Sequence, residues 1–218
     1  MFIVIDGIDG SGKGTQLLRV KEALEKSWKT VLVLDFPRHW EDSAFAVKKY
    51  LNWEYGMEVS AKQSSLFYAI DRYDAANDFS KKMKNYDYVI SNRYVSANMI
   101  HQWWKIHDTN ERKEFLNWVD DLEYNVFQIP RPDITIFLNV SPEMSQKLVE
   151  KKEVREYIQW DENKDIHEAD EDHLIQAHSV ACDIVEQFDD WIRIDCEENW
   201  HLLSREIITE KILNTIKN

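Results

Sequence analysis

Glycine is rare in this chain and is concentrated near its start. The 218 residues contain five glycines, where average usage would give about fifteen. Four of the five lie within residues 7–15, GIDGSGKGT. Glycine allows backbone conformations that other side chains forbid. Because this segment follows the apolar run 2–6 and precedes a helical pattern, it predicts a phosphate-binding loop between a buried strand and a helix.

The predicted loop supplies the groups that the phosphates of a nucleotide need. Its backbone N–H groups can surround phosphate oxygens, and the helix that starts near Lys13 adds the positive end of its dipole. Lys13 brings a full charge to the β- and γ-phosphates. An ordinary glycine-rich turn is the alternative interpretation. The residues expected to bind these phosphates are Gly10, Ser11, Gly12, Lys13, Gly14 and Thr15.

The loop departs from the usual pattern at one position. Gly14 follows Lys13 where a hydroxyl residue ordinarily binds Mg²⁺, and the hydroxyl comes one position later, at Thr15. We therefore expect the ion to depend on phosphate oxygens, water and a nearby carboxylate such as Asp9. The loop by itself indicates only that a nucleotide phosphate is bound, since kinases, GTPases, ATP-driven machines and non-catalytic sensors all carry one.

The rest of the chain predicts a single α/β domain over residues 1–218. Short apolar runs that indicate buried strands occupy residues 2–6, 31–34, 86–91, 134–138 and 191–195. Helical patterns lie between them, among them 60–84, 111–127 and a helix that begins with Pro142. Continuous apolar strands that alternate with helices indicate a five-stranded parallel sheet with helices on both faces.

Composition excludes some partners. Lys and Arg number 27 against 40 Asp and Glu, a formal net charge of −13, which argues against a nucleic-acid partner because such proteins carry a basic patch. No apolar run exceeds five residues, so we expect no membrane segment. Cys182 and Cys196 are isolated and fit reduced thiols. We therefore expect a cytoplasmic protein.

A second phosphate site is predicted from two arginines at strand ends. Arg38 follows the second strand and Arg93 follows the third, and ligands of open α/β sheets bind outside the carboxyl ends of the strands. We expect both guanidinium groups to face the crevice of the phosphate loop and to bind a second phosphate. A solvated surface arginine is the alternative for either residue taken alone.

Two further groups of residues suit a nucleotide substrate. Tyr68 and Arg72 are four residues apart on the long helix and share a face, so the ring can stack on a base while the guanidinium binds its edge; a simple packing pair is the alternative. Residues 150–165 carry four basic residues among acidic ones. This segment is either a short lid that closes on the transferred phosphoryl group or a solvated charged face.

Five blocks of the sequence resemble, in order and spacing, the motifs of thymidylate kinases. The blocks are 7–15 (GIDGSGKGT), 36–38 (FPR), 66–72 (LFYAIDR), 91–98 (SNRYVSAN) and 132–138 (PDITIFL). The resemblance implies a P-loop kinase fold with a lid at about 150–165. It also implies transfer of the γ-phosphoryl group of ATP to dTMP, giving dTDP and ADP for dTTP synthesis, with Mg²⁺ as cofactor. Members are commonly homodimers.

The resemblance assigns roles at the acceptor site. Asp9 matches the loop carboxylate near the sugar 3′-hydroxyl and the metal, while Arg38 and Arg93 match the arginines that hold the acceptor monophosphate. Tyr68 stands where an aromatic ring stacks on thymine, and Arg72 where the edge of the base is bound.

Further roles follow from the same resemblance. Asn98 resembles a base-reading amide, and His101 stands where many members have Tyr near the sugar 2′ position. Asp165 and Glu168 match the acidic pair after the lid, so Glu168 joins Asp9 as an expected metal ligand. The catalytic residues expected on these grounds are Lys13, Arg93 and Arg155.

The chain also departs from the family pattern. Asn92 and Asn139 each replace a usual Asp, and the loss at Asn92 removes a charge near the metal. Members place a catalytic arginine either in the phosphate loop or in the lid. Because the loop position here is Gly10, the lid must provide it, and Arg155 is the expected residue.

Two alternative functions remain open at this stage. A deoxynucleoside kinase of the same fold must deprotonate a hydroxyl and places a carboxylate before the proline after the second strand, where this chain has Phe36. A catalytically weakened P-loop nucleotide-binding protein is the second alternative, and Asn92 and Asn139 are the residues that favour it.

Overall fold

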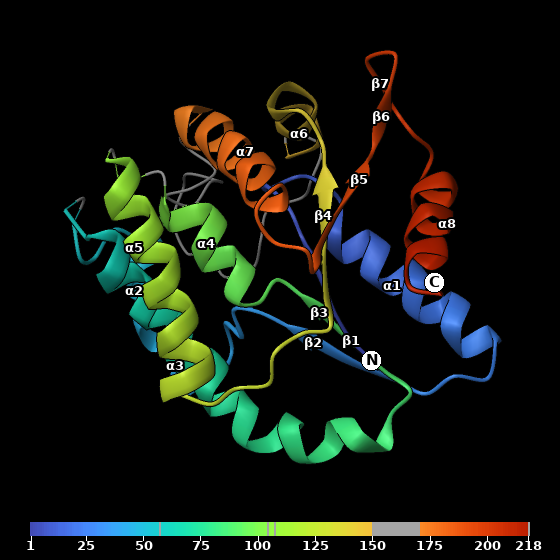
Figure 1. The fold of residues 1–218 in the computed structure, drawn as a ribbon, viewed down its shortest axis with the longest axis horizontal. Helices are drawn as coiled ribbons and strands as arrows, with labels where there is room; N and C mark the ends of the chain where they lie inside the picture. Colours follow the sequence, from blue (N-terminus) through green and yellow to red (C-terminus); the bar gives the residue numbers. More distant parts are fainter. Residues whose placement is uncertain (57, 104, 107, 150–170, 218) are drawn as a thin grey trace.

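A parallel sheet forms the centre of the molecule. The computed structural model describes residues 1–56, 58–103, 105–106, 108–149 and 171–217. Five strands pair in the order β2-β3-β1-β4-β5, and every pair is parallel (Figure 1). Their bounds are β1 Phe2–Asp6, β2 Val31–Asp35, β3 Tyr88–Asn92, β4 Ile134–Asn139 and β5 Trp191–Asp195. The predicted five-stranded parallel sheet is confirmed.

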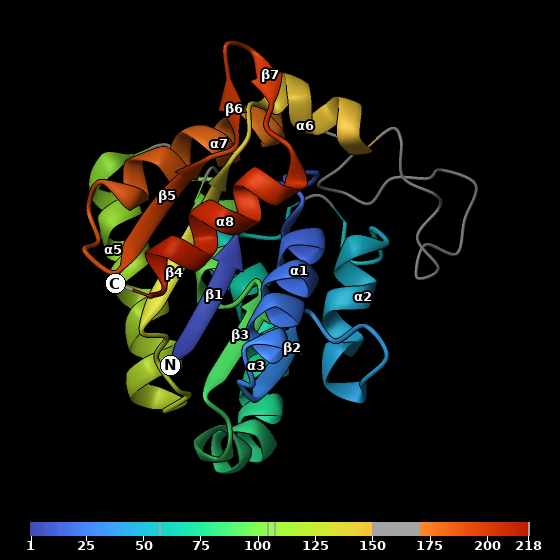
Figure 2. The same cartoon turned by 90° about the vertical axis from the view of Figure 1, so that its right-hand side faces the viewer.

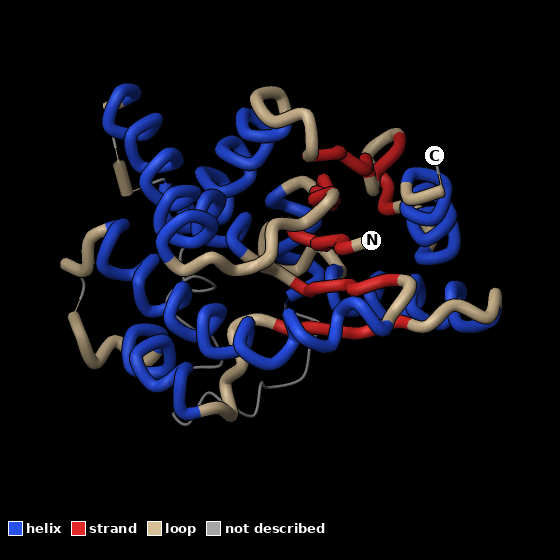
Figure 3. The backbone as a smooth tube through the Cα atoms, turned by 60° about the horizontal axis from the view of Figure 1, so that its bottom comes forward, coloured by secondary structure: helices blue, strands red, loops and turns tan. Residues whose placement is uncertain are grey.

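Alternate residues of β1 face two separate hydrophobic cores. Phe2 and Val4 belong to one core, and Ile3 and Ile5 to the other. The first core contains residues of α3 (Ala61–Lys82), α4 (Val95–Trp103) and α7 (Glu171–Val185). The second contains residues of α1 (Lys13–Lys26) and α8 (Arg205–Thr215). Helices therefore cover both faces, with the strands between them (Figure 3).

Local sequence explains where several helices begin. Ser60 caps α3 and forms a capping box with Gln63. Asp108 caps α5, Thr109–Asp120, by accepting hydrogen bonds from two backbone N–H groups. Pro142 is the first residue of α6, Pro142–Val149, as predicted, because a proline at this position loses no hydrogen bond.

The helix predicted over 111–127 is an α-helix only in its first part. After α5 the chain continues as a π-helix, Asp121–Val126. Such wider turns often occur at functional sites. Here the turn contains Glu123, which is fully buried. The strand predicted to begin at Tyr86 begins instead at Tyr88, because the N–H of Tyr86 is bound to the carbonyl of Met83 in the 3-10 turn Met83–Asn85.

Two small features were not predicted. A 3-10 turn, Asp42–Ala44, leads into α2, Phe45–Leu51, and α2 packs on α3 through a small cluster that includes Val47 and Tyr50. A short antiparallel hairpin of β6, Glu197–Glu198, and β7, His201–Leu202, projects beyond β5 (Figure 2). Both features are too short to give a periodic pattern. In the described part of the chain, no helix is long and apolar enough to span a membrane.

Candidate active site

A cavity of about 340 Å³ lies at the carboxyl ends of β1, β2 and β3. The predicted site residues that line it are Asp9, Gly10, Gly12, Lys13, Gly14, Thr15, Tyr68, Arg72, Arg93, Asn98 and His101. The residues expected to bind phosphate and those expected to bind a base therefore share one cavity. Ser11 and Arg38 are not among the lining residues. Arg155, Asp165 and Glu168 lie outside the described residues.

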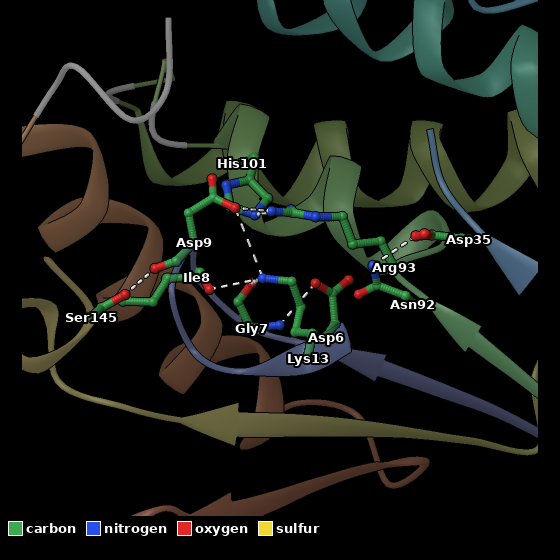
Figure 4. Close-up of polar contacts among 10 residues, drawn as sticks. All are labelled: Asp6, Gly7, Ile8, Asp9, Lys13, Asp35, Asn92, Arg93, His101 and Ser145. Carbon is green, nitrogen blue, oxygen red and sulfur yellow. Dashed lines mark hydrogen bonds and ion pairs between the residues drawn. The ribbon is translucent and has the colours of Figure 1, made fainter. Parts of the chain in front are cut away.

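The phosphate loop packs tightly against α6. Gly10 has a φ of +84°, and a Cβ atom there would clash with the carbonyl oxygen of Ser145. The Ser145 hydroxyl, in addition, donates to the carbonyl of Asp9 (Figure 4). This contact leaves no room for a side chain at position 10, which gives a steric reason for the absence of a loop arginine. Around Gly14, in contrast, a Cβ would meet nothing within 4 Å.

Lys13 is buried at the start of α1, with 7% of its surface exposed. Its Nζ donates to the carbonyl oxygens of Gly7, at 3.0 Å, and Ile8, at 2.9 Å. The same Nζ lies 3.9 Å from Oδ1 of Asp9. The ammonium group is therefore held inside the curve of the loop by backbone carbonyls and one carboxylate (Figure 4).

Arg93 joins two of the other predicted residues. Its Nη2 donates to Oδ1 of Asp9, and its Nη1 lies 2.6 Å from Nε2 of His101 (Figure 4). A guanidinium group only donates hydrogen bonds, so Nε2 of His101 acts as the acceptor and the proton of the neutral ring belongs on Nδ1. Arg93 has a φ of +60° at the turn after β3, and its N–H donates to the carbonyl of Ile5 at 3.0 Å.

A buried ion pair lies at the other end of the cavity. Arg72 donates through Nε and Nη2 to the two carboxylate oxygens of Glu123, at 2.5 Å each. Nδ2 of Asn98 donates to the same carboxylate at 3.0 Å and to the Ser65 carbonyl at 3.1 Å. Burial works against the charge of Arg72, but Glu123 outweighs it and holds the pKa of Arg72 above its ordinary value.

Glu123 was missed at the level of sequence. An acidic residue in a helical pattern is ordinarily exposed, and nothing in the spacing of residues 111–127 distinguishes Glu123 from its acidic neighbours. Glu123 lies in the π-helix, is buried there, and accepts hydrogen bonds from both Arg72 and Asn98. The one signal in the sequence was the arginine itself, because a buried guanidinium needs a carboxylate partner.

Arg93 lines the cavity, whereas the guanidinium of Arg38 is paired with two acidic side chains of α3. Nε of Arg38 donates to Oδ1 of Asp71 at 3.0 Å, and its Nη2 lies 2.7 Å from Asp74 Oδ2 and 2.7 Å from Ser43 Oγ. Burial opposes the charge of Arg38, but Asp74 and Asp71 hold its pKa above the ordinary value. Two acidic residues on α3 therefore hold this guanidinium.

The two asparagines that depart from the family pattern each contact a carboxylate. Nδ2 of Asn92 donates to Oδ1 of Asp35, a cavity residue, at 2.7 Å. Burial raises the pKa of Asp35, against the opposing influence of Asn92 and of the nearby cations. An aspartate at position 92 would meet this carboxylate directly, and like charges so close are unfavourable. Asn139 likewise donates to Asp195 at 2.7 Å.

The fold and the cavity together define a class of protein. A parallel sheet whose first strand leads through a glycine-rich loop into a helix, with a lysine inside the loop, is the arrangement of P-loop phosphotransferases. The guanidinium and aromatic groups across the cavity indicate that the phosphoryl acceptor is itself a small anionic molecule with a planar ring.

Comparison with known proteins gives the particular family. The family model described as thymidylate kinase matches residues 5–207. The thymidylate kinase of Mycobacterium tuberculosis is 30% identical over 147 residues, covering 66% of this chain and 68% of the relative. That of Prochlorococcus marinus is 29% identical over 224 residues, covering 100% and 97%. The chain belongs to the thymidylate kinase family.

A solved structure agrees with the fold. The thymidylate kinase of Candida albicans superposes with a TM-score of 0.73 at 18% identity, covering 99% of this chain and 90% of the other. Because the chain belongs to the thymidylate kinase family, it is an ATP-dependent nucleoside monophosphate kinase that phosphorylates dTMP. The comparisons do not favour the deoxynucleoside kinase or the catalytically weakened nucleotide-binding protein.

Proposed function

We propose that dTMP and the phosphates of ATP meet in the cavity described above, with Lys13 on one side and Arg93 on the other. One observation carries this proposal: a single cavity is lined by the phosphate loop and also by Tyr68, Arg72 and Asn98. We call the part lined by Tyr68, Arg72 and Asn98 the base end. The acceptor phosphate then lies beside Arg93, near the carboxylate of Asp9.

The chemistry needs positioning and charge rather than a base. The second pKa of a phosphate monoester is about 6, so dTMP is mostly a dianion at pH 7 and attacks without losing a proton. The transferred group spreads negative charge over its oxygens, which Lys13 and Arg93 neutralise. Arg155 is the third cation in this proposal, supplied by the segment 150–165.

The residues present also fit Mg²⁺. Asp9 and Asp35 both line the cavity with their carboxylates beside cations, and Mg²⁺ typically takes one or two carboxylates together with phosphate oxygens and water. Asp35 supplies the charge that Asn92 lacks. Glu168 is the further proposed ligand. Among the described residues no three His, Cys, Asp or Glu side chains gather, so the bound ion depends on the substrates' own oxygens, whose charge it neutralises.

The proposal extends to a homodimer in the cytoplasm. Leu66, Ile70 and Tyr73 lie on one face of α3 and are 36%, 47% and 46% exposed, an apolar stripe that a second copy of the chain would bury. Cys182 and Cys196 are both free thiols, which fits a reducing compartment.

The proposed function is tested by measuring ADP release with a panel of acceptors. We expect turnover with dTMP and Mg²⁺, little without Mg²⁺, and none with thymidine. Arg93→Ala should lower kcat for dTMP by at least about 100-fold, the scale of losing one preorganised charge. Turnover with thymidine but not with dTMP would contradict the proposal, and near-normal kcat in Arg93→Ala would contradict the role of Arg93.

A further inference from the structure

Lys105 does not line the cavity, but its side chain reaches two elements that do. It follows α4 and is half-buried. Its Nζ lies 2.7 Å from Oη of Tyr50, 3.1 Å from Oγ of Ser64 and 3.2 Å from the carbonyl oxygen of Val59. An ammonium group has three N–H donors. Each donor of Lys105 therefore has one oxygen acceptor, and these come from α2, from the connection between α2 and α3, and from α3.

The first contact leads to Tyr68. Nζ of Lys105 lies 4.9 Å from the centre of the Tyr50 ring as well as beside its hydroxyl. The ring of Tyr50 packs edge-on against the ring of Tyr68, with centroids 6.3 Å apart and an interplanar angle of 88°. Tyr68 and Leu51, the neighbour of Tyr50, both line the cavity. By holding Tyr50, Lys105 therefore fixes the position of Tyr68 in the wall of the base end.

The second contact leads to Gln102. Oγ of Ser64 accepts from Lys105, and its shortest contact with an acceptor is to Oε1 of Gln102, at 2.7 Å. The carbonyl oxygens of Ser60, at 2.9 Å, and Ala61, at 3.2 Å, are the other acceptors for its single proton. Gln102 is 1% exposed and lines the cavity. Because Ser64 occupies the amide oxygen, the orientation of the Gln102 amide depends on this chain of hydrogen bonds. Lys105 thus contacts Tyr50 and Ser64, which in turn contact the cavity residues Tyr68 and Gln102. These two cavity residues belong to different helices, α3 and α4.

We propose that Lys105 is a positioning residue for the dTMP base, acting on Tyr68 through Tyr50 and on Gln102 through Ser64. The inference rests on the proposed placement of the base at the base end of the cavity. It predicts that Lys105 governs dTMP binding and leaves the phosphoryl transfer step and ATP binding unaffected, since its hydrogen bonds are to Tyr50, Val59 and Ser64 and not to Lys13 or Arg93.

The charge of Lys105 gives this role a pH dependence. Burial lowers the pKa of Lys105 to about 8. Among the described residues no charged group offsets the effect of burial on Lys105, and the Tyr50 hydroxyl is the titratable group that its Nζ contacts. As the pH rises through 8 the ammonium group loses a proton, one of the three hydrogen bonds is lost, and dTMP should bind more weakly.

Lys105→Met tests the proposal because it keeps the aliphatic stem and removes all three donors. We expect the KM for dTMP to rise about tenfold while kcat and the KM for ATP change less than about twofold, the pattern of lost uniform binding. In the unmodified protein kcat/KM for dTMP should fall above pH 8, and in Lys105→Met this fall should be absent. Lys105→Arg, which stays charged throughout, should restore part of the KM and also lack the fall. The control is Lys113→Met, at an exposed position of α5.

An unchanged KM and an unchanged pH profile in Lys105→Met would overturn the inference, as would an equal loss of kcat and ATP binding. If Lys105→Met does not fold, Tyr50→Phe and Ser64→Ala carry the test, because each removes one acceptor and should raise the KM for dTMP about threefold. Unchanged KM values in both would also overturn it. A failure of the proposed function would give a different result from a failure of the Lys105 inference, because the unmodified protein would then not phosphorylate dTMP.

Discussion

At the scale of single residues, Gly10 is under the strongest steric constraint in the phosphate loop. Its φ of +84° is strained for any other residue, and the carbonyl of Ser145 lies where a Cβ would go. Gly14, four residues on, is in ordinary helical backbone with open space around it. The two glycines of one motif therefore serve different purposes, and only the first is required by packing.

Substituting these two glycines separates their roles. Gly10→Ala should lower kcat/KM for ATP by at least about 100-fold, because a small displacement of the loop misplaces the reacting phosphate. Gly14→Ala should lower kcat/KM for ATP by less than about tenfold. Steady-state kinetics with ATP as the varied substrate make the comparison. Equal losses in the two variants would contradict the steric argument.

The sequence predicted the site residue by residue only where one motif determines the geometry. The phosphate loop places Lys13 and Asp9 by itself, and Arg93 follows from its place at a strand end. Arg38 was placed by the same rule, but its guanidinium is paired with Asp71 and Asp74 on α3 and is not among the groups that line the cavity. Whether Arg38 pairs with these residues depends on the distance between the segment after β2 and α3. A single sequence does not give that distance.

At the scale of elements, the buried pair of Arg72 and Glu123 joins α3 to the π-helix. Both side chains are buried, at 2% and 0% exposure. The strands were predictable from their continuous apolar runs, whereas this link was not, since the residues of the π-helix carry no pattern that distinguishes it from an α-helix. The π-helix turns Glu123 toward α3, so one irregular element sets the position of the Arg72 side chain in the cavity.

Removing one side chain of this ion pair should destabilise the protein more than replacing both side chains with apolar ones. Arg72→Met and Glu123→Leu should each lower the free energy of unfolding by about 3–5 kcal/mol, because each leaves one buried charge without its partner. The free energy of unfolding of the double variant should fall by less than the sum of the two single losses, since no unpaired charge remains. Urea unfolding of the three variants measures this. Additive losses would show that the pair is not coupled.

At the scale of the whole molecule, Leu66, Ile70 and Tyr73 form an exposed apolar stripe on a single helix. Ile70 lies at the middle of the stripe. Its neighbours Leu66 and Tyr73 lie four residues before and three after, so the three side chains share one face of α3. Residues of the opposite face, Asp71 and Arg72, are buried within the chain.

A charge placed on this stripe should separate the proposed dimer. Ile70→Glu should shift the protein from dimer to monomer in sedimentation velocity, with an unchanged circular dichroism spectrum, because a buried unpaired carboxylate is unfavourable at an interface. Glu22→Lys, at an exposed position of α1, is the matched control and should remain dimeric. A monomeric unmodified protein would contradict the dimer.

The shared cavity is tested most directly by a crystal structure with a bisubstrate analogue that joins thymidine to adenosine through a chain of phosphates. The account predicts that the thymine ring lies beside Tyr68 and Arg72 while the phosphates pass Arg93 and enter the loop around Lys13. An analogue that binds with its phosphates in the loop but with its thymine outside this cavity would contradict the account.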